Sequence, residues 1–204
     1  MPACDLIDVS SLSCLPALKE LIIPQNRQLI LETIPINLTQ LEKLNVSDCN
    51  VSNLSHLTRF ECLEELHLSD NRAIKLDTIP LGFRRKRKFN EATSPVAVSN
   101  VLTHLRKLFL TGCSLTDISA LNRFPMVEEC CLSWNSIIAD SIPRNLIHLR
   151  SLSLEGCGLN DVSSLVRLPS LEEVDLRGNY RLDLQTIPRG LKYMYHTDSY
   201  LIKS

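Results

Sequence analysis

A nine-residue pattern, L-x-x-L-x-L-x-x-N/C, constrains this chain more than any other feature. It occurs seven times in the 204 residues, and the copies begin at Leu18, Leu41, Leu63, Leu105, Val127, Leu149 and Leu171. The ninth position alternates between Asn and Cys without exception: Asn26, Cys49, Asn71, Cys113, Asn135, Cys157 and Asn179. A sequence repeat of about 22 residues predicts a solenoid, in which each unit packs only on its neighbours. We therefore expect a single domain over residues 1–204.

The two kinds of repeat differ in their second halves. Cys-type repeats continue with a residue that we expect to cap a short helical turn, namely Asp8, Asn53, Asp117 or Asp161. Asn-type repeats close with T/S-I-P, where proline ends regular structure. The central Leu-x-Leu predicts a short strand with inward leucines. Residues 1–17 contain a partial Cys-type repeat, because Cys4 stands 14 residues before Leu18, and an eighth strand-like pattern starts at Leu191.

These repeats resemble the leucine-rich-repeat superfamily. The 22-residue Cys-type units with D-V-S-x-L are similar to the short repeats of bacterial internalins and phosphatase-1 regulatory subunits, and the resemblance covers nearly the whole chain outside one insertion. It implies an α/β leucine-rich-repeat solenoid with a curved parallel sheet on the concave face and short helical or irregular segments on the convex side. It also implies a protein-binding role, although a fold alone does not determine function.

One insertion interrupts the repeats at residues 82–100, GFRRKRKFNEATSPVAVSN. It contains five consecutive basic residues, which are Arg84, Arg85, Lys86, Arg87 and Lys88. Such a run is a candidate nuclear-import signal, and the alternative is a solvated surface loop. Ser94, which precedes Pro95, is a candidate phosphosite whose charge would oppose the basic run.

The outward-facing strand positions predict where a partner binds. The third position of the repeat alternates in charge along Glu20, Lys43, Glu65, Lys107 and Glu129. Opposite charges on neighbouring strands help to fix the register of a parallel sheet. The candidate partner-binding residues are His67, Asp70, Phe109, Cys131, Trp134 and Asp175. Of these, Phe109, Cys131 and Trp134 are expected to form an apolar patch that anchors a partner, unless convex loops or the insertion cover it.

Composition and motifs favour binding over catalysis. The net charge of −1 gives no global attraction to nucleic acid or to an anionic membrane. The sequence contains no phosphate-binding loop, no H-E-x-x-H and no Cys-x-x-Cys motif, so we predict no catalytic residues, no metal and no cofactor. No apolar run is long enough to span a bilayer, and the N-terminus lacks the features of a signal peptide.

The eight cysteines indicate a compartment. The ladder residues Cys4, Cys49, Cys113 and Cys157 are expected to face inward, as is Cys130, and buried thiols behave as small apolar groups. We therefore expect a reducing, intracellular location, cytoplasmic or nuclear.

Three functions are consistent with these observations. The first is a protein-interaction module that binds a protein partner on its concave face, for example as a regulatory or targeting subunit. The second is a nuclear or nucleic-acid-associated scaffold that uses the basic run. The third is the recognition fragment of a larger receptor or enzyme, because the first repeat is partial and no amphipathic cap helix precedes it. The alternative is a short protein with improvised ends, in which Tyr193, Tyr195 and Tyr200 form a makeshift cap.

Overall fold

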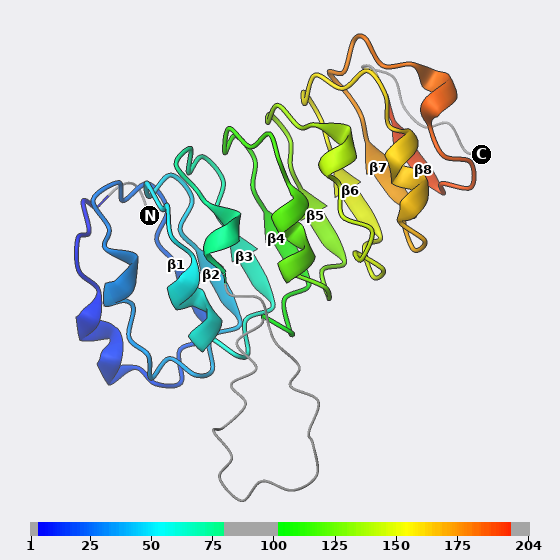
Figure 1. The fold of residues 1–204 in the computed structure, drawn as a ribbon. Helices are drawn as coiled ribbons and strands as arrows, with labels where there is room; N and C mark the ends of the chain where they lie inside the picture. Colours follow the sequence, from blue (N-terminus) through cyan, green and yellow to red (C-terminus); the bar gives the residue numbers. More distant parts are fainter. Residues whose placement is uncertain (1–3, 80–101, 197–204) are drawn as a thin grey trace, which may run out of the picture.

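The computed structural model describes residues 4–79 and 102–196, and within them the chain forms an open, curved sheet of parallel strands (Figure 1). The strands are β1 (Glu20–Ile22), β2 (Lys43–Asn45), β3 (Glu65–His67), β4 (Lys107–Phe109), β5 (Glu129–Cys131), β6 (Ser151–Ser153), β7 (Glu173–Asp175) and β8 (Tyr193–Tyr195). Each pairs only with its neighbours in sequence. The predicted solenoid is confirmed. The insertion 82–100, with the basic run and Ser94, lies outside the described residues.

Short 3₁₀ helices form the convex side and lie in front of the strands in Figure 1. Cys-type repeats carry η1 (Ser10–Cys14), η3 (Ser55–Arg59), η5 (Ser119–Arg123) and η7 (Ser163–Arg167). Asn-type repeats carry η2 (Leu31–Thr33), η4 (Leu76–Thr78), η6 (Ala139–Ser141) and η8 (Leu184–Thr186). The residues predicted to cap the Cys-type helices bind the first helical N–H from one residue before the N-cap position: the Asp117 carboxylate accepts a hydrogen bond from the Ser119 N–H at 2.8 Å, while the N-cap residue itself is Ile118. Asp8, Asn53 and Asp161 make the same contact two residues ahead.

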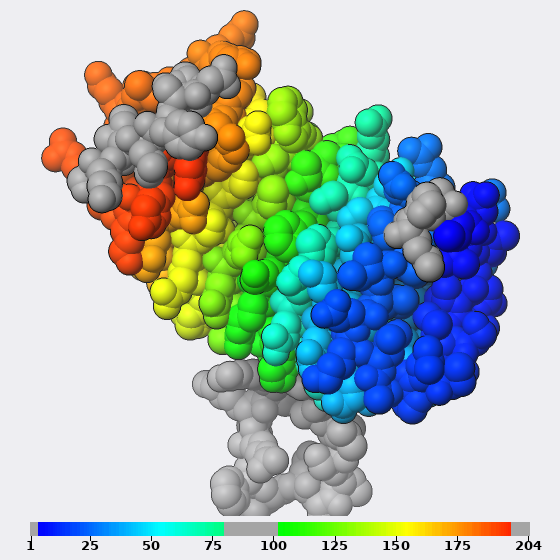
Figure 2. All heavy atoms as spheres, turned by 180° about the vertical axis from the view of Figure 1, so that it is seen from behind, coloured from blue at the N-terminus to red at the C-terminus, as the bar shows by residue number. Residues whose placement is uncertain are grey.

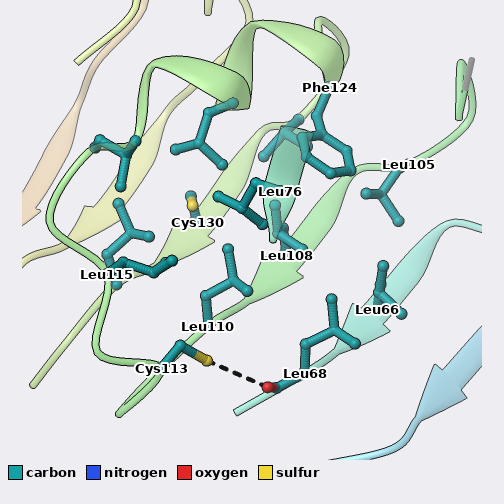
Figure 3. Packing of buried hydrophobic residues seen from close by; sticks show 14 of the residues in the cluster. Leu66, Leu68, Leu76, Leu105, Leu108, Leu110, Cys113, Leu115, Phe124 and Cys130 are labelled. Carbon is teal, nitrogen blue, oxygen red and sulfur yellow. Dashed lines mark hydrogen bonds between the residues drawn. The ribbon is translucent and has the colours of Figure 1, made fainter. Parts of the chain in front are cut away.

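A continuous hydrophobic core lies between the sheet and the 3₁₀ helices. The middle residue of each strand points into it, because side chains alternate between the two faces of a strand. Leu66 and Leu108 are fully buried, and Figure 3 shows them in one cluster with Phe124, which enters the core from the convex side. The buried residue at the centre of β5 is Cys130 in place of a leucine, as predicted.

The buried asparagines join each Asn-type repeat to the Cys-type repeat before it. Asn71 accepts hydrogen bonds from the backbone N–H groups of Cys49, at 3.1 Å, and Val51, at 2.7 Å. Its side-chain amide donates to the carbonyls of Val46, at 3.0 Å, and Leu68, at 2.7 Å. An asparagine has both donors and an acceptor, so one side chain satisfies four buried backbone groups.

The cysteine ladder supplies the other connection between repeats, because each of its buried thiols bonds from a Cys-type repeat to the Asn-type repeat before it. The Cys113 thiol donates to the Leu68 carbonyl at 3.3 Å, which is the dashed line in Figure 3. Cys49 and Cys157 donate in the same way. Cys4 is an exception to the prediction that the ladder faces inward, since it is exposed. It lies at the end of the described stack, where no earlier described repeat packs on it.

A ladder of hydroxyl groups on the convex side reinforces the contact within each pair of repeats. The Thr78 hydroxyl accepts from the N–H of Leu54 in the preceding repeat at 2.8 Å and donates to the Lys75 carbonyl at 2.6 Å. Equivalent bonds are made by Thr33, Ser141 and Thr186. The hydroxyl residue of the T/S-I-P element therefore connects repeats, a role that the sequence analysis did not assign to it.

Replacing Thr78 by Val is expected to lower the free energy of unfolding by about 2 kcal/mol, because it keeps the side-chain shape and leaves the Leu54 N–H without its acceptor. Urea denaturation measures the change. Thr58→Val is the control, since the Thr58 hydroxyl bonds only to Ser55 within its own 3₁₀ helix. Equal losses in the two variants would show that the connection between repeats contributes nothing of its own.

Candidate partner-binding surface

The eighth position of each repeat, just after the strand, has a left-handed backbone conformation. Its φ angle is 63° in Gln25, 51° in Asp48, 62° in Asp70, 66° in Gly112, 58° in Trp134, 63° in Gly156 and 69° in Gly178. Glycine adopts this conformation freely, and Asp and Asn tolerate it better than bulky residues do. A tryptophan is therefore the residue in this row that the local backbone favours least.

Trp134 is 61% exposed, and its indole lies over the backbone of the next repeat. A Cβ atom on Gly156 would stand 2.7 Å from the indole, so the glycine makes room for the ring. Asp70 repeats this arrangement, because a Cβ atom on Gly112 would stand 2.6 Å from the Asp70 carboxylate. We call the row formed by Asp70, Gly112, Trp134, Gly156 and Gly178 the ridge. Figure 2 shows the molecule from the side opposite to the view of Figure 1, and successive repeats appear there as adjacent coloured bands.

His67 and Phe109 form a stacked pair on the neighbouring strands β3 and β4. Their ring centroids are 4.2 Å apart and the ring planes differ by 10°. The His67 ring nitrogen Nε2 lies 2.6 Å from the Glu65 carboxylate, which also contacts Lys43. Burial alone would raise the pKa of Glu65, but the contacts with Lys43 and His67 hold it below its ordinary value. The two rings are therefore held in one orientation on the sheet.

Cys131, which pairs with Phe109 in the register of β4 and β5, belongs to a chain of polar side chains. Its thiol is 3.2 Å from the Thr111 hydroxyl and 3.5 Å from that of Ser133, which contacts Ser153 at 2.7 Å. The ring stacking of Phe109 is with His67, while Trp134 leans toward Gly156. An apolar patch formed by Phe109, Cys131 and Trp134 stays a prediction.

Asp175 is held by a residue in the turn that follows its strand. Arg177 donates to both carboxylate oxygens of Asp175, at distances of 2.6 to 3.2 Å, and lies over the Tyr195 ring. Hydrogen bonding to Asp175 raises the pKa of Arg177. A cation of a partner would therefore have to compete with Arg177 for Asp175. The roles of Arg177 and Tyr195 were not inferred from the sequence.

The outward surface carries an excess of negative charge. The outward positions of the seven repeats hold eight carboxylates: Glu20, Asp48, Glu65, Asp70, Glu129, Glu155, Glu173 and Asp175. Against these stand three cations: Lys43, Lys107 and Arg177. The predicted alternation is confirmed, since Lys43 faces Glu65 in the register and Lys107 faces Glu129, each as an ion pair. Asp70 has no ion pair with any described residue.

None of the eight cysteines, all of which lie in the described residues, forms a disulfide, and they fall into buried and accessible groups. Cys49, Cys113, Cys130 and Cys157 are buried, whereas Cys4, Cys14 and Cys62 are exposed and Cys131 is intermediate. Burial raises the pKa of the Cys113 and Cys157 thiols to about 11. Because only the thiolate is nucleophilic, the buried thiols are expected to be inert at neutral pH.

Iodoacetamide at pH 8 is expected to alkylate the three exposed cysteines of the native protein quickly and the four buried ones only in denaturant. A thiol in the unfolded chain has a pKa of about 8.5. The stability that Cys113 and Cys157 contribute is thus complete below that pH and is lost as the pH rises through about 11. Peptide mass spectrometry after a timed pulse measures the labelling. Rapid native labelling of Cys113 would contradict this assignment.

No group of three His, Cys, Asp or Glu residues suited to a metal ion occurs among residues 4–79 and 102–196. Within the same residues, no helix has the length and apolar character needed to cross a membrane.

Comparison with known proteins identifies the class of fold. No protein-family model matches the sequence, and no curated protein matches it. Solved structures do: internalin C2 of Listeria monocytogenes has a TM-score of 0.67 at 21% identity, over 94% of this chain and 76% of internalin C2. Together with the repeat and the parallel sheet, this similarity shows that the chain has a leucine-rich-repeat fold.

Two further structures extend the comparison. The functional domain of Listeria monocytogenes InlJ, described as including a cysteine ladder, has a TM-score of 0.62 at 18% identity, over 96% of this chain and 44% of that one. Toll, from the Drosophila Toll–Spatzle complex, has a TM-score of 0.68 at 17% identity, over 93% of this chain and 25% of that one. The chain thus spans less than half of InlJ and a quarter of Toll. At these identities the similarity concerns the fold alone.

Proposed function

We propose that this chain is a protein-interaction module that binds a protein partner on its concave face, with Trp134 as the main anchor. Similar structures include the Toll–Spatzle complex and the mouse RP105/MD-1 complex, so solenoids of this fold do serve as protein-binding domains. The proposal favours binding over catalysis. A role as a regulatory or targeting subunit would be one use of such a module.

The observation that carries the proposal is the conformation of Trp134. A left-handed backbone at a bulky residue costs about 1–2 kcal/mol. The equivalent residues in the other repeats are Gly, Asp and Gln, so the fold itself does not need an indole there. The ring is also largely exposed, which leaves the hydrophobic contribution of its burial unrealised in the free protein. A partner that covers the ring would recover that contribution, as aromatic anchors in interfaces do.

The sheet is large enough for this role. Eight strands spaced by about 4.8 Å make a surface roughly 34 Å wide. A standard protein interface of about 800 Å² on each partner fits on such a surface. The stacked pair of His67 and Phe109, on the two strands before β5, offers a second apolar contact near Trp134.

Trp134→Gly is expected to raise the free energy of unfolding by about 1 kcal/mol, because glycine relieves the left-handed strain. The same change is expected to weaken partner binding by roughly 30-fold, as the loss of an interface hot spot does. The measurement combines urea denaturation with a quantitative pull-down from lysate of the source cells.

Val166→Ala is the matched control, since Val166 is a 73% exposed apolar residue on the convex helix η7. A partner that is lost with Trp134→Gly and kept with Val166→Ala supports the proposal. A partner that binds Trp134→Gly as well as it binds the wild type excludes Trp134 as the anchor.

The intracellular location and the alternative function as a nuclear or nucleic-acid-associated scaffold stay predictions. Both the import signal and the phosphosite depend on the insertion 82–100. The alternative that the chain is part of a larger receptor or enzyme is likewise still a prediction.

A further inference from the structure

We infer that the ridge binds an extended protein segment in which a basic residue stands about three residues from an apolar one. The inference rests on the proposed function and specifies the chemistry of the partner. The basic residue would pair with Asp70, and the apolar residue would pack on Trp134.

Asp70 provides the acidic end of this site. Its carboxylate is exposed, lies over Gly112 and makes no ion pair with any described residue. By contrast, Asp175 is bound by Arg177, and Asp48 is bound by Arg27 at 2.9 Å. Asp70 is therefore a carboxylate of the ridge that a cation of a partner can reach without displacing one from this chain.

Trp134 provides the apolar end, and two glycines make room for the two anchor side chains. The Asp70 carboxylate lies over Gly112 and the Trp134 indole lies over Gly156, so both lean toward the next repeat. Both residues are exposed, so a partner's side chains can reach them. The negative excess of the surrounding surface favours a basic segment over an acidic one.

The spacing of the strands sets the spacing of the partner's residues. Asp70 follows β3 and Trp134 follows β5, with β4 between them. Two strand separations amount to about 9.6 Å. A segment in the extended polyproline II conformation rises about 3.1 Å per residue with three residues per turn, so its residues i and i+3 lie on the same side, about 9.3 Å apart. A segment that crosses the ends of the strands therefore places residues i and i+3 over Asp70 and Trp134.

The test is a selection of random twelve-residue peptides, displayed on phage, on the immobilised full-length protein. Selected peptides that carry a fluorescent label are then titrated in solution by fluorescence anisotropy, which also measures binding to Trp134→Gly. Because the chain has one tryptophan, a change in the intrinsic fluorescence of the wild type reports on Trp134 itself. We expect the peptides to share a Lys or Arg three residues from a Leu, Ile, Met or aromatic residue. Replacing that Lys or Arg by Glu is expected to weaken binding at least tenfold.

Asp70→Asn is the decisive variant, because Asn tolerates the left-handed backbone as Asp does, so that the change removes only the charge. We expect it to weaken the binding of the selected peptides at least fivefold. The control Asp77→Asn, on the convex helix η4, is expected to leave their affinity unchanged.

The outcomes separate this inference from the proposed function. Peptides that need Trp134 but bind Asp70→Asn as tightly as the wild type overturn the inference. Peptides that share no basic residue at this spacing overturn it as well. Both outcomes leave Trp134 as the anchor. Peptides that bind Trp134→Gly as well as the wild type overturn the inference and also contradict the proposed function.

Discussion

Asn71→Ala is expected to lower the free energy of unfolding by about 4 kcal/mol, because it leaves two buried N–H groups and one carbonyl without partners and leaves a second carbonyl with only the Cys113 thiol. These groups belong to Cys49, Val51, Val46 and Leu68, which are buried in the middle of the stack. At roughly 3 °C per kcal/mol, the midpoint of thermal unfolding would fall by about 12 °C. Urea denaturation followed by circular dichroism measures the free energy.

Asn122→Ala is the control for this prediction, since Asn122 is exposed on the convex helix η5. A substitution at such a position is expected to change stability by less than about 0.5 kcal/mol. If Asn71→Ala were as mild as Asn122→Ala, water would be replacing the side chain, and the buried amide could not be the reason for the asparagine ladder.

Phe124→Ala is expected to lower the free energy of unfolding by about 4 kcal/mol, because it empties a fully enclosed site in a continuous core. Phe124 is 0% exposed, and Figure 3 shows its ring packed among the leucines of neighbouring repeats. Phe124→Leu is expected to cost only about 1 kcal/mol, since Leu168 holds the equivalent place in another Cys-type repeat.

Phe109→Ala is the matched comparison, because Phe109 lies on the sheet surface and its ring contact is with His67. Phe109→Ala is expected to lower the free energy of unfolding by about 1 kcal/mol, which is the contribution of a partly exposed aromatic pair. A larger effect at Phe109 than at Phe124 would show that the solenoid depends on its surface pairs more than on its core.

The strands and their register could be predicted from the sequence because both depend on local spacing. In the third repeat Glu65 and His67 face outward and Leu66 faces inward, as the alternation of the pattern requires. Because most steps between repeats have nearly the same length, equivalent residues come to lie side by side. The pairing of Lys43 with Glu65 and of Lys107 with Glu129 follows from that regularity.

The site was less predictable. The candidate residues were chosen as outward-facing, but their neighbours depend on how side chains lean. The stacking of His67 on Phe109 and the binding of Asp175 by Arg177 are examples. A usable signal was overlooked in the eighth position of the repeat, which is rich in Gly and Asp. Such a row indicates a left-handed turn and marks Trp134 as its exception.

By itself the sequence determined the period, the inward and outward faces and the order of the strands, since each depends on residues close together along the chain. The packing of repeat on repeat explains why Asn and Cys alternate, because Asn71 bonds to backbone groups 20 to 25 residues away in the sequence. Stacking likewise assigned Thr78 its contact with Leu54. It also placed the Trp134 indole over Gly156. Such contacts exist only once neighbouring repeats have packed, and for this reason the pattern within one repeat does not reveal them.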